Sequence, residues 1–289
     1  MKSKLLDFLV IGAAKSGTTS LFHYLRHHPR IYLPPEKEIS FFSNEEWFAR
    51  GWDEFVREFF GGAPADVQWG KVTPHYMAYP HVPKRISDLM PKVKLIALLR
   101  NPVDRAFSHY RMAVRTAGER RTFEQVISDP SSEPNATGFL RLGEYGRIIG
   151  SFAKHFPSEQ LKIFFAEDLE PRPKFVVDSI LTYLGLDPSF SPRNLGERYH
   201  QGGVRQRFPW FIPAACRISP LWRLWRALPE NRRRVLRFWF HTQINTIVEP
   251  APEIDANLRC KLVEFYRPDV LELERLILNE VPWKEFHLK

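Results

Sequence analysis

The sequence predicts an α/β fold: a parallel β-sheet flanked by helices on both faces, followed by a helical C-terminal extension. Short apolar runs rich in β-branched and aromatic residues alternate along the chain with longer segments at helical spacing. The most apolar runs have the continuous character of strands that are buried on both faces. The length of 289 residues fits one such domain with an appendage or two modest domains, and we favour the first.

The strands are predicted from the apolar runs in chain order. Two runs, "VKLIALL" and "LKIFFA", are the clearest after the first one, and the acidic pair Glu167-Asp168 follows the second of them. The predicted strands cover residues 5–11, 30–33, 68–72, 93–99 and 161–166.

The helices are predicted from apolar positions three and four residues apart and from signals at their ends. The first covers residues 18–26. A second covers 103–112, where Asn101 can act as the cap and Pro102 can take the first helical position. A third corresponds to "PKFVVDSILTYLGL" at 173–186.

The C-terminal third predicts a loop and then a helix. Residues 193–210 are rich in Gly, Arg and Asn, which is typical of a loop. Further on, five apolar residues at alternating steps of three and four predict an amphipathic helix that Pro268 interrupts. These residues are Val263, Tyr266, Val270, Leu273 and Ile277.

Composition restricts the cellular compartment and the kinds of partner that the sequence predicts. Lys and Arg total 42 against 33 Asp and Glu, a net charge of +9, which predicts an anionic ligand or surface without identifying it. Cys216 and Cys260 have neither CxxC spacing nor nearby His ligands, so we expect free thiols and no metal site. Asp7 and Gly12 interrupt the N-terminal apolar run, and no run reaches the ~18 residues of a membrane span. These features predict a cytoplasmic protein.

The stretch "GAAKSGTT" at 12–19 predicts a P-loop-like phosphate site. A glycine-rich turn between a buried strand and a helix points backbone N–H groups at one spot, where the helix N-terminus adds positive potential. In the ATP-binding pattern GxxxxGK[ST], the lysine at the seventh place reaches the β and γ phosphates. Here Thr18 stands at that place and Lys15 lies within the arch of the loop. The alternative is a plain strand-to-helix turn that needs its glycines for geometry alone.

Arg100 points to a second phosphate. A magnesium-dependent phosphoryl transferase needs an acidic residue at a neighbouring strand end to hold the metal. The strand at 93–99 is followed by Arg100 instead, which favours direct binding of an additional phosphate, and Ser108 on the next helix could share it. A surface salt bridge and a solvated hydroxyl are the alternatives.

Three stretches together carry a resemblance to a known family. They are "FLVIGAAKSGTTSLFHYLRHHPRIYLPPEKEISFF", "LIALLRNPVDRAFSHYRM" and "LGEYGRIIGSFAKHFPSEQLKIFFAEDL". They resemble the sulfotransferases that use 3′-phosphoadenosine 5′-phosphosulfate (PAPS), above all the bacterial members and the heparan sulfate N- and O-sulfotransferase type. The resemblance covers residues from about 8 to about 190.

The resemblance implies which residues bind PAPS without a metal. It makes "AKSGTT" the 5′-phosphosulfate loop, with Lys15 stabilising the bridging oxygen as adenosine 3′,5′-bisphosphate departs. Arg100 and Ser108 would bind the 3′-phosphate, and "RYHQGGVRQR" stands where a loop closes over the nucleotide, although a basic surface loop is an equal alternative. The implied set is Lys15, Ser16, Gly17, Thr18, Thr19, Arg100, Ser108, Gly203, Val204 and Arg205.

A base must accept the proton of the acceptor as it attacks sulfur. Glu38 in "PPEKEISFF" occupies the place of the glutamate that heparan-type enzymes use, and Phe41 and Phe42 would anchor its strand in the core. Glu36 has the same strand parity and competes for the role, and a solvent-facing charged strand edge is the plain alternative.

The stretch "GKVTPHYM" departs from the family. Heparan-type enzymes often have Glu-Lys-Ser/Thr here, with the lysine near the sulfonate. In this chain Lys71 is one place off, so we expect its side chain to face the other side of a strand. His75 is the candidate substitute or auxiliary base, against a purely structural role.

The sequence therefore predicts a single PAPS-dependent sulfotransferase domain over 1–289. Residues 1–190 form the nucleotide-binding core, and 191–289 form the covering loop and the helical C-terminal part. The expected acceptor is a saccharide or glycolipid, followed by a small natural product or lipid alcohol, and no nucleic acid partner is expected. The Trp- and Arg-rich segment 207–240 could contact a membrane surface or pack internally. A magnesium-dependent nucleotide kinase and a non-catalytic polyanion-binding module are the rival functions.

Overall fold

The computed structural model describes residues 3–116, 119–128, 138–197, 199, 204–206, 246–248 and 253–288. The chain divides into two compact units, one formed by 1–200 with 254–289 and the other by 201–253, and each is described by itself. The assignment of 1–289 to a single domain stays a prediction.

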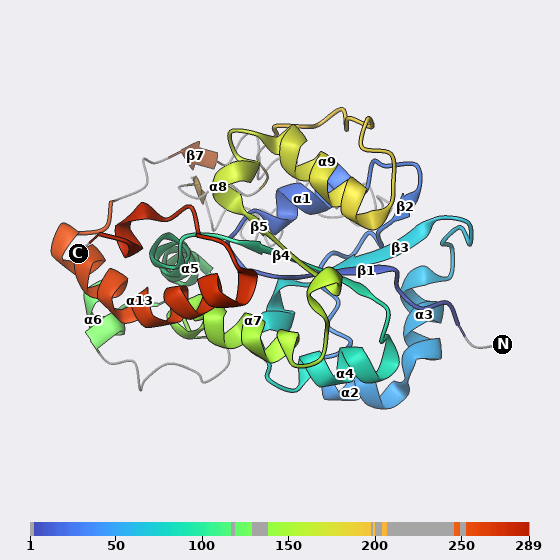
Figure 1. Ribbon diagram of the computed structural model, residues 1–289, viewed down its shortest axis with the longest axis horizontal. Coiled ribbons are helices and arrows are strands. Elements are labelled where there is room, and N and C mark those ends of the chain that lie inside the picture. Colours follow the sequence, from blue (N-terminus) through green and yellow to red (C-terminus); the bar gives the residue numbers. More distant parts are fainter. Residues whose placement is uncertain are drawn as a thin grey trace, which may run out of the picture. The chain divides into compact units, whose positions relative to one another are not determined.

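A parallel sheet forms the centre of the larger unit, and it confirms the predicted fold class (Figure 1). Within the described residues it has five strands in the order β2-β3-β1-β4-β5, and every adjacent pair is parallel. The strands are β1 Phe8–Gly12, β2 Ile31–Tyr32, β3 Gln68–Val72, β4 Lys94–Leu99 and β5 Leu161–Phe165. All five correspond to the strands that the apolar runs predict.

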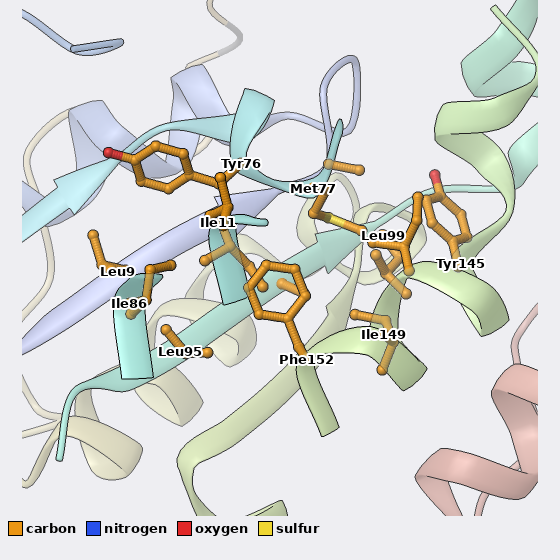
Figure 2. Close-up of a cluster of buried hydrophobic side chains, with 14 of the residues drawn as sticks. Leu9, Ile11, Tyr76, Met77, Ile86, Leu95, Leu99, Tyr145, Ile149 and Phe152 are labelled. Atoms are coloured by element: carbon orange, nitrogen blue, oxygen red, sulfur yellow. The ribbon is translucent and has the colours of Figure 1, made fainter. Parts of the chain in front are cut away.

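Alternate residues of the central strands enter two separate hydrophobic cores, because successive side chains of a strand point to opposite faces. On β1, Leu9 and Ile11 lie in one core, whereas Phe8 and Val10 lie in the other. Figure 2 shows part of the first core, where side chains from β1 and β4 meet those of neighbouring helices. Gly70 of β3 leaves room for the ring of Phe8, since a Cβ there would come within 2.1 Å of it.

Helices cover both faces of the sheet, as the sequence predicts. Helices α4 and α7 contribute to the core of Leu9, and α1 and α9 to the core of Phe8 (Figure 1). The described α-helices are α1 Thr18–Leu25, α2 Glu45–Arg50, α3 Trp52–Phe60, α4 Val82–Leu89, α5 Pro102–Thr116, α6 Phe123–Ser128, α7 Tyr145–Ala153, α8 Ala166–Leu169, α9 Pro173–Leu184 and α13 Ala256–Ile277. Short 3-10 helices are η1 Pro74–Ala78, η3 Arg141–Gly143, η4 Ser158–Gln160 and η6 Lys284–Phe286.

Helix α13 runs without interruption through Pro268, so the predicted break there is wrong. Proline removes one backbone hydrogen bond of the helix. Burial of one face of α13, including Tyr266 and Val270 at 0% exposure, outweighs that local cost. The next residue, Asp269, also accepts the backbone N–H groups of Gly146 and Arg147 at 2.8 Å, which joins α13 to the start of α7.

The smaller unit contains a two-stranded antiparallel sheet of β6 Val204–Gln206 and β7 Thr246–Val248. The predicted loop over 193–210 is therefore wrong at β6, where pairing with a distant segment decides the structure. Gly203, Cys216 and the segment 207–240 lie outside the described residues. Cys260 is a free, exposed thiol. None of the helices that the structure describes is both long and apolar enough to cross a membrane.

Candidate active site

The predicted site residues gather at one edge of the sheet. Because the strands are parallel, the loops that leave their carboxyl ends lie at the same edge, where α/β proteins bind ligands. The loop after β1 carries Lys15, and the segment after β2 carries Glu38. His75 follows β3, and Arg100 follows β4. The topology thus brings the four main candidates to a single edge.

The loop after β1 has the shape of an anion site. Lys15 and Gly17 have φ angles of 72° and 89°, which curve the chain so that helix α1 can begin at Thr18. Among the described residues, no side chain caps the N-terminus of α1, and the buried Ser16 hydroxyl lies near the hydroxyl of Tyr145. A helix N-terminus without a side-chain cap and with a hydroxyl beside it suits a phosphate or sulfonate oxygen.

Gly17→Ala is expected to weaken binding of adenosine 3′,5′-bisphosphate, as measured by calorimetry. The φ of 89° costs alanine about 1–2 kcal/mol, and the new Cβ would lie 3.1 Å from a methyl carbon of Leu169, so the loop must shift. Gly185→Ala is the matched control, because Gly185 also has a positive φ of 79° and nothing lies within 4 Å of its added Cβ. Equal nucleotide affinity in the two variants would argue against a phosphate site at this loop.

Arg100 contacts the loop after β1 directly. Its Nη1 donates to the backbone oxygen of Lys15 at 3.4 Å, so the guanidinium stands beside the arch. Ser108 lies on α5 and is partly buried. The structure therefore joins Arg100 to the loop, while a shared phosphate between Arg100 and Ser108 stays a prediction. Val204 and Arg205 lie in β6 of the other unit, and their role also stays a prediction.

Glu38 and His75 form a hydrogen-bonded pair. His75 Nε2 lies 3.0 Å from Glu38 Oε2, and Lys37 Nζ lies 2.5 Å from Glu38 Oε1. The hydrogen bond to His75 and the contact with Lys37 lower the pKa of Glu38 to about 2, although its partial burial acts in the opposite direction. The side chains of Glu38 and His75 remain 43% and 47% exposed, so a substrate can reach the pair.

The segment that carries Glu38 is not a strand, contrary to the sequence prediction. Residues 33–40 form neither helix nor strand, so the shared strand parity of Glu36 and Glu38 has no structural meaning. Phe41 and Phe42 are 2% and 1% exposed and do anchor the end of this segment. Lys71 pairs with Leu9 and lies on the face of the sheet opposite to that of its neighbour Val72, as its displacement by one place predicts, and its Nζ donates to the backbone oxygen of Glu36.

Helix α5 contributes residues that the sequence reasoning missed. Lys15 Nζ lies 3.7 Å from Met112 Sδ, so the ammonium points toward α5. Burial lowers the pKa of His109 to about 3, and the nearby charges of Arg105, Lys15 and His75 act in the same direction. The positions 105, 109 and 112 are four and three residues apart, so they share one helix face, and this spacing is the signal that could have revealed them.

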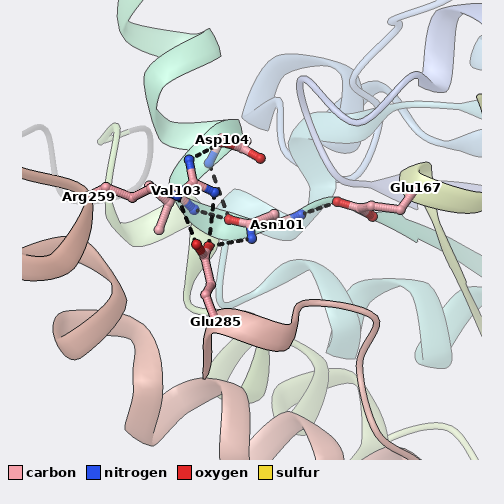
Figure 3. Close-up of polar contacts among 6 residues, drawn as sticks. All are labelled: Asn101, Val103, Asp104, Glu167, Arg259 and Glu285. Atoms are coloured by element: carbon pink, nitrogen blue, oxygen red, sulfur yellow. Dashed lines mark hydrogen bonds and ion pairs between the residues drawn. The ribbon is translucent and has the colours of Figure 1, made fainter. Parts of the chain in front are cut away.

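A polar network fixes the strand end that carries Arg100 (Figure 3). The backbone N–H of Asn101 donates to Glu167 at 2.8 Å, and Asn101 Nδ2 donates to Glu285 at 2.7 Å. Arg259 of α13 donates to Glu285 and to Asp104, each at 2.8 Å. The C-terminal part of the chain thereby holds the start of α5 in place.

Comparison with known proteins agrees with this geometry. The profile of the family described as "Sulfotransferase domain" matches residues 5–199. Mouse bifunctional heparan sulfate N-deacetylase/N-sulfotransferase 3 is 34% identical over 207 residues, which are 65% of this chain and 23% of that protein. Mouse heparan sulfate glucosamine 3-O-sulfotransferase 5 is 29% identical over 194 residues, which are 65% of this chain and 55% of that protein.

A solved structure has the same fold over nearly the whole chain. The sulfotransferase from Alicyclobacillus acidocaldarius has a TM-score of 0.70 and 24% identity, with 99% of this chain and 100% of that chain covered. The chain spans only about a quarter to half of the two mouse relatives, so their further activities do not transfer to it. The family match covers more than half of the chain, and the chain therefore belongs to the sulfotransferase family of enzymes.

Proposed function

We propose that the protein transfers the sulfuryl group of PAPS to a hydroxyl or amine of a saccharide acceptor and releases adenosine 3′,5′-bisphosphate. The observation that carries the proposal is the contact between Arg100 and the loop that holds Lys15 in its arch, at 3.4 Å. This arrangement offers cationic groups at two adjacent points, as a nucleotide with separate 5′ and 3′ phosphates requires. Members of the sulfotransferase family typically use this donor.

The nucleotide fits the groups that the site presents. The start of α1 has no side-chain cap, and the backbone N–H groups there can donate to the 5′ oxygens of the nucleotide, with the Ser16 hydroxyl beside them. Arg100 supplies charge where a metal-dependent enzyme would place a carboxylate. Thr18 and Thr19 begin α1 beside these donors.

The transfer breaks the bond between sulfur and the bridging oxygen and forms a bond from sulfur to the acceptor oxygen or nitrogen. Negative charge builds on the departing phosphate, and Lys15 stabilises it from within the loop. The acceptor loses its proton to the protein. The two electrons of the broken bond remain on the bridging oxygen.

The Glu38–His75 pair supplies the proton acceptor. A carboxylate with a pKa of about 2 is a weak base, and both of its oxygens are already engaged. When His75 donates its Nε2–H to Glu38, its Nδ1 is left as the acceptor of a proton. We therefore assign proton acceptance to His75 and orientation of the imidazole to Glu38, which revises the sequence-based choice of Glu38 as base.

A saccharide is the acceptor class that the relatives favour. The names of the mouse relatives specify heparan sulfate and, in one case, its glucosamine. The net charge of +9 is compatible with an anionic glycan. A panel of glucosamine-containing oligosaccharides and simple alcohols, assayed with labelled PAPS, tests this part of the proposal.

Calorimetry with Arg100→Ala tests the nucleotide site. Loss of one charged hydrogen bond is expected to weaken adenosine 3′,5′-bisphosphate binding by about 10- to 100-fold. Arg275→Ala is the matched control, because it removes the same charge from a side chain that is 77% exposed on α13. Tighter binding of ATP with magnesium than of adenosine 3′,5′-bisphosphate with a chelator would favour a nucleotide kinase instead.

A further inference from the structure

Lys71 is a buried charged residue that the proposed mechanism does not use. It lies on β3 beside Leu9 of β1 and is 1% exposed. An ammonium group in such a place costs free energy unless it is well paired, and an apolar side chain of similar volume often gives a more stable protein. The sheet therefore needs no lysine at this position for packing.

Lys71 holds the backbone next to Glu38. Its Nζ donates to the backbone oxygen of Glu36. On the other side of Glu38, the hydroxyls of Thr73 and Tyr76 donate to the backbone oxygen of Ile39 at 3.3 and 3.4 Å. Since residues 33–40 form no helix or strand, these side-chain donors take the place of backbone pairing. The two anchored carbonyls lie on either side of Glu38.

The hydrogen bond from Lys71 survives a change in its charge. Burial lowers the pKa of Lys71 to about 7, although the carboxylates of Glu36 and Glu38 act in the opposite direction. The ammonium and the neutral amine both donate N–H, so the contact with Glu36 persists in either form. The hydrogen bond from Lys71 therefore fixes the chain segment in either protonation state.

We propose that Lys71 is a positioning residue, which anchors the backbone before Glu38 so that the Glu38 carboxylate stays against His75. The inference rests on the proposed role of the Glu38–His75 pair in accepting a proton. It differs from a catalytic role, because the Lys71 side chain is buried and its Nζ is engaged with the backbone oxygen of Glu36.

Two variants of Lys71 and one matched control test the proposal. Lys71→Met keeps the volume and removes the donor, whereas Lys71→Gln keeps a shorter donor without charge. Lys94→Met is the control, because Lys94 Nζ also donates to a backbone oxygen, that of Tyr183 at 2.7 Å, from a strand of the same sheet. The readouts are kcat, KM for PAPS with the best acceptor of the panel, and the titration of Glu38 by carbon NMR.

Lys71→Met is expected to lower kcat by about 10- to 100-fold, since small misplacement of a reacting group has effects of that size. KM for PAPS should change less than about twofold, because the nucleotide groups lie on other loops. Lys71→Gln should be intermediate, and Lys94→Met should match the native protein. In Lys71→Met the pKa of Glu38 should rise from about 2 toward its ordinary value of 4.5, as the fixed contact with His75 is lost.

A Glu38 pKa that stays near 2 in Lys71→Met would overturn the proposal. So would the loss of the folded state in both Lys71→Met and Lys71→Gln, since that would assign the residue a purely structural role. If the native protein shows no turnover with PAPS, the proposed function fails. The NMR titration still decides, without turnover, whether Lys71 positions Glu38.

Discussion

Replacing Lys15 by alanine is expected to lower the rate of sulfuryl transfer by about 10²- to 10³-fold. The loop places this lysine within its arch at a φ of 72°, and its ammonium points toward α5 near Met112. The charge on the departing phosphate would then develop without a cationic partner. Affinity for adenosine 3′,5′-bisphosphate should also fall, because under the proposed function the same ammonium would contact the bound product. Initial rates with labelled PAPS and calorimetry measure the two effects.

Lys15→Gly distinguishes the effect of losing the ammonium from the effect of straining the backbone at this position. Glycine adopts a φ of 72° without strain, so this variant should be at least as resistant to urea as the native protein. It should nevertheless be as inactive as Lys15→Ala. Lys154→Ala, at an exposed position after α7, controls for the loss of one positive charge. Native turnover in Lys15→Gly would remove the lysine from the mechanism.

Replacing His75 by alanine is expected to lower kcat by about 10²- to 10⁴-fold while nucleotide affinity stays nearly unchanged. Glu38→Gln should also lower kcat, because glutamine cannot stabilise the imidazolium that forms when His75 takes the proton. The double variant should be little worse than the poorer single variant, since the two side chains act as one unit at 3.0 Å. Single-turnover rates with saturating PAPS measure these effects.

The pH profile distinguishes the two possible bases. The lowered pKa of Glu38 keeps its carboxylate ionised from neutral pH down to about 2. If Glu38 alone accepted the proton, activity would persist to that acidity, limited only by unfolding. If His75 accepts it, turnover requires a neutral imidazole, and activity is lost at an acidity that leaves the Glu38 carboxylate ionised. His155→Ala, at an exposed position after α7, should leave the profile unchanged, and persistence of activity near pH 3 would contradict the assignment to His75.

The fold could be predicted from the sequence because its sheet consists of apolar runs that are buried on both faces. The runs at 5–11 and 93–99 contain β1 and β4, where local composition and tertiary burial agree. The continuity of α13 through Pro268 could not be predicted, since it depends on what the helix packs against. The spacing of apolar residues within the helix does not reveal such tertiary contacts.

The candidate site, like the fold, could be predicted only where the sequence carries a local signal. Lys15 and Arg100 could be identified because a glycine turn and a strand end are local signals. The geometry of Glu38 could not, because donors about 35 residues away, such as Lys71 and Thr73, shape its segment. Strand parity does not apply to residues 33–40, which form no strand, so it could not distinguish Glu36 from Glu38.

The network around Asn101 has a consequence for how the enzyme assembles. Asn101 and Glu285 are hydrogen-bonded although 184 positions separate them in the chain. Contacts of such high sequence separation carry a large loop-closure entropy and form late in folding. During synthesis, the 184 residues that follow Asn101 must be added before Glu285 can hold the strand end that carries Arg100. A chain that has reached only β5 can therefore build the sheet, but the strand end that carries Arg100 is held by Glu285 only after that residue has been synthesised.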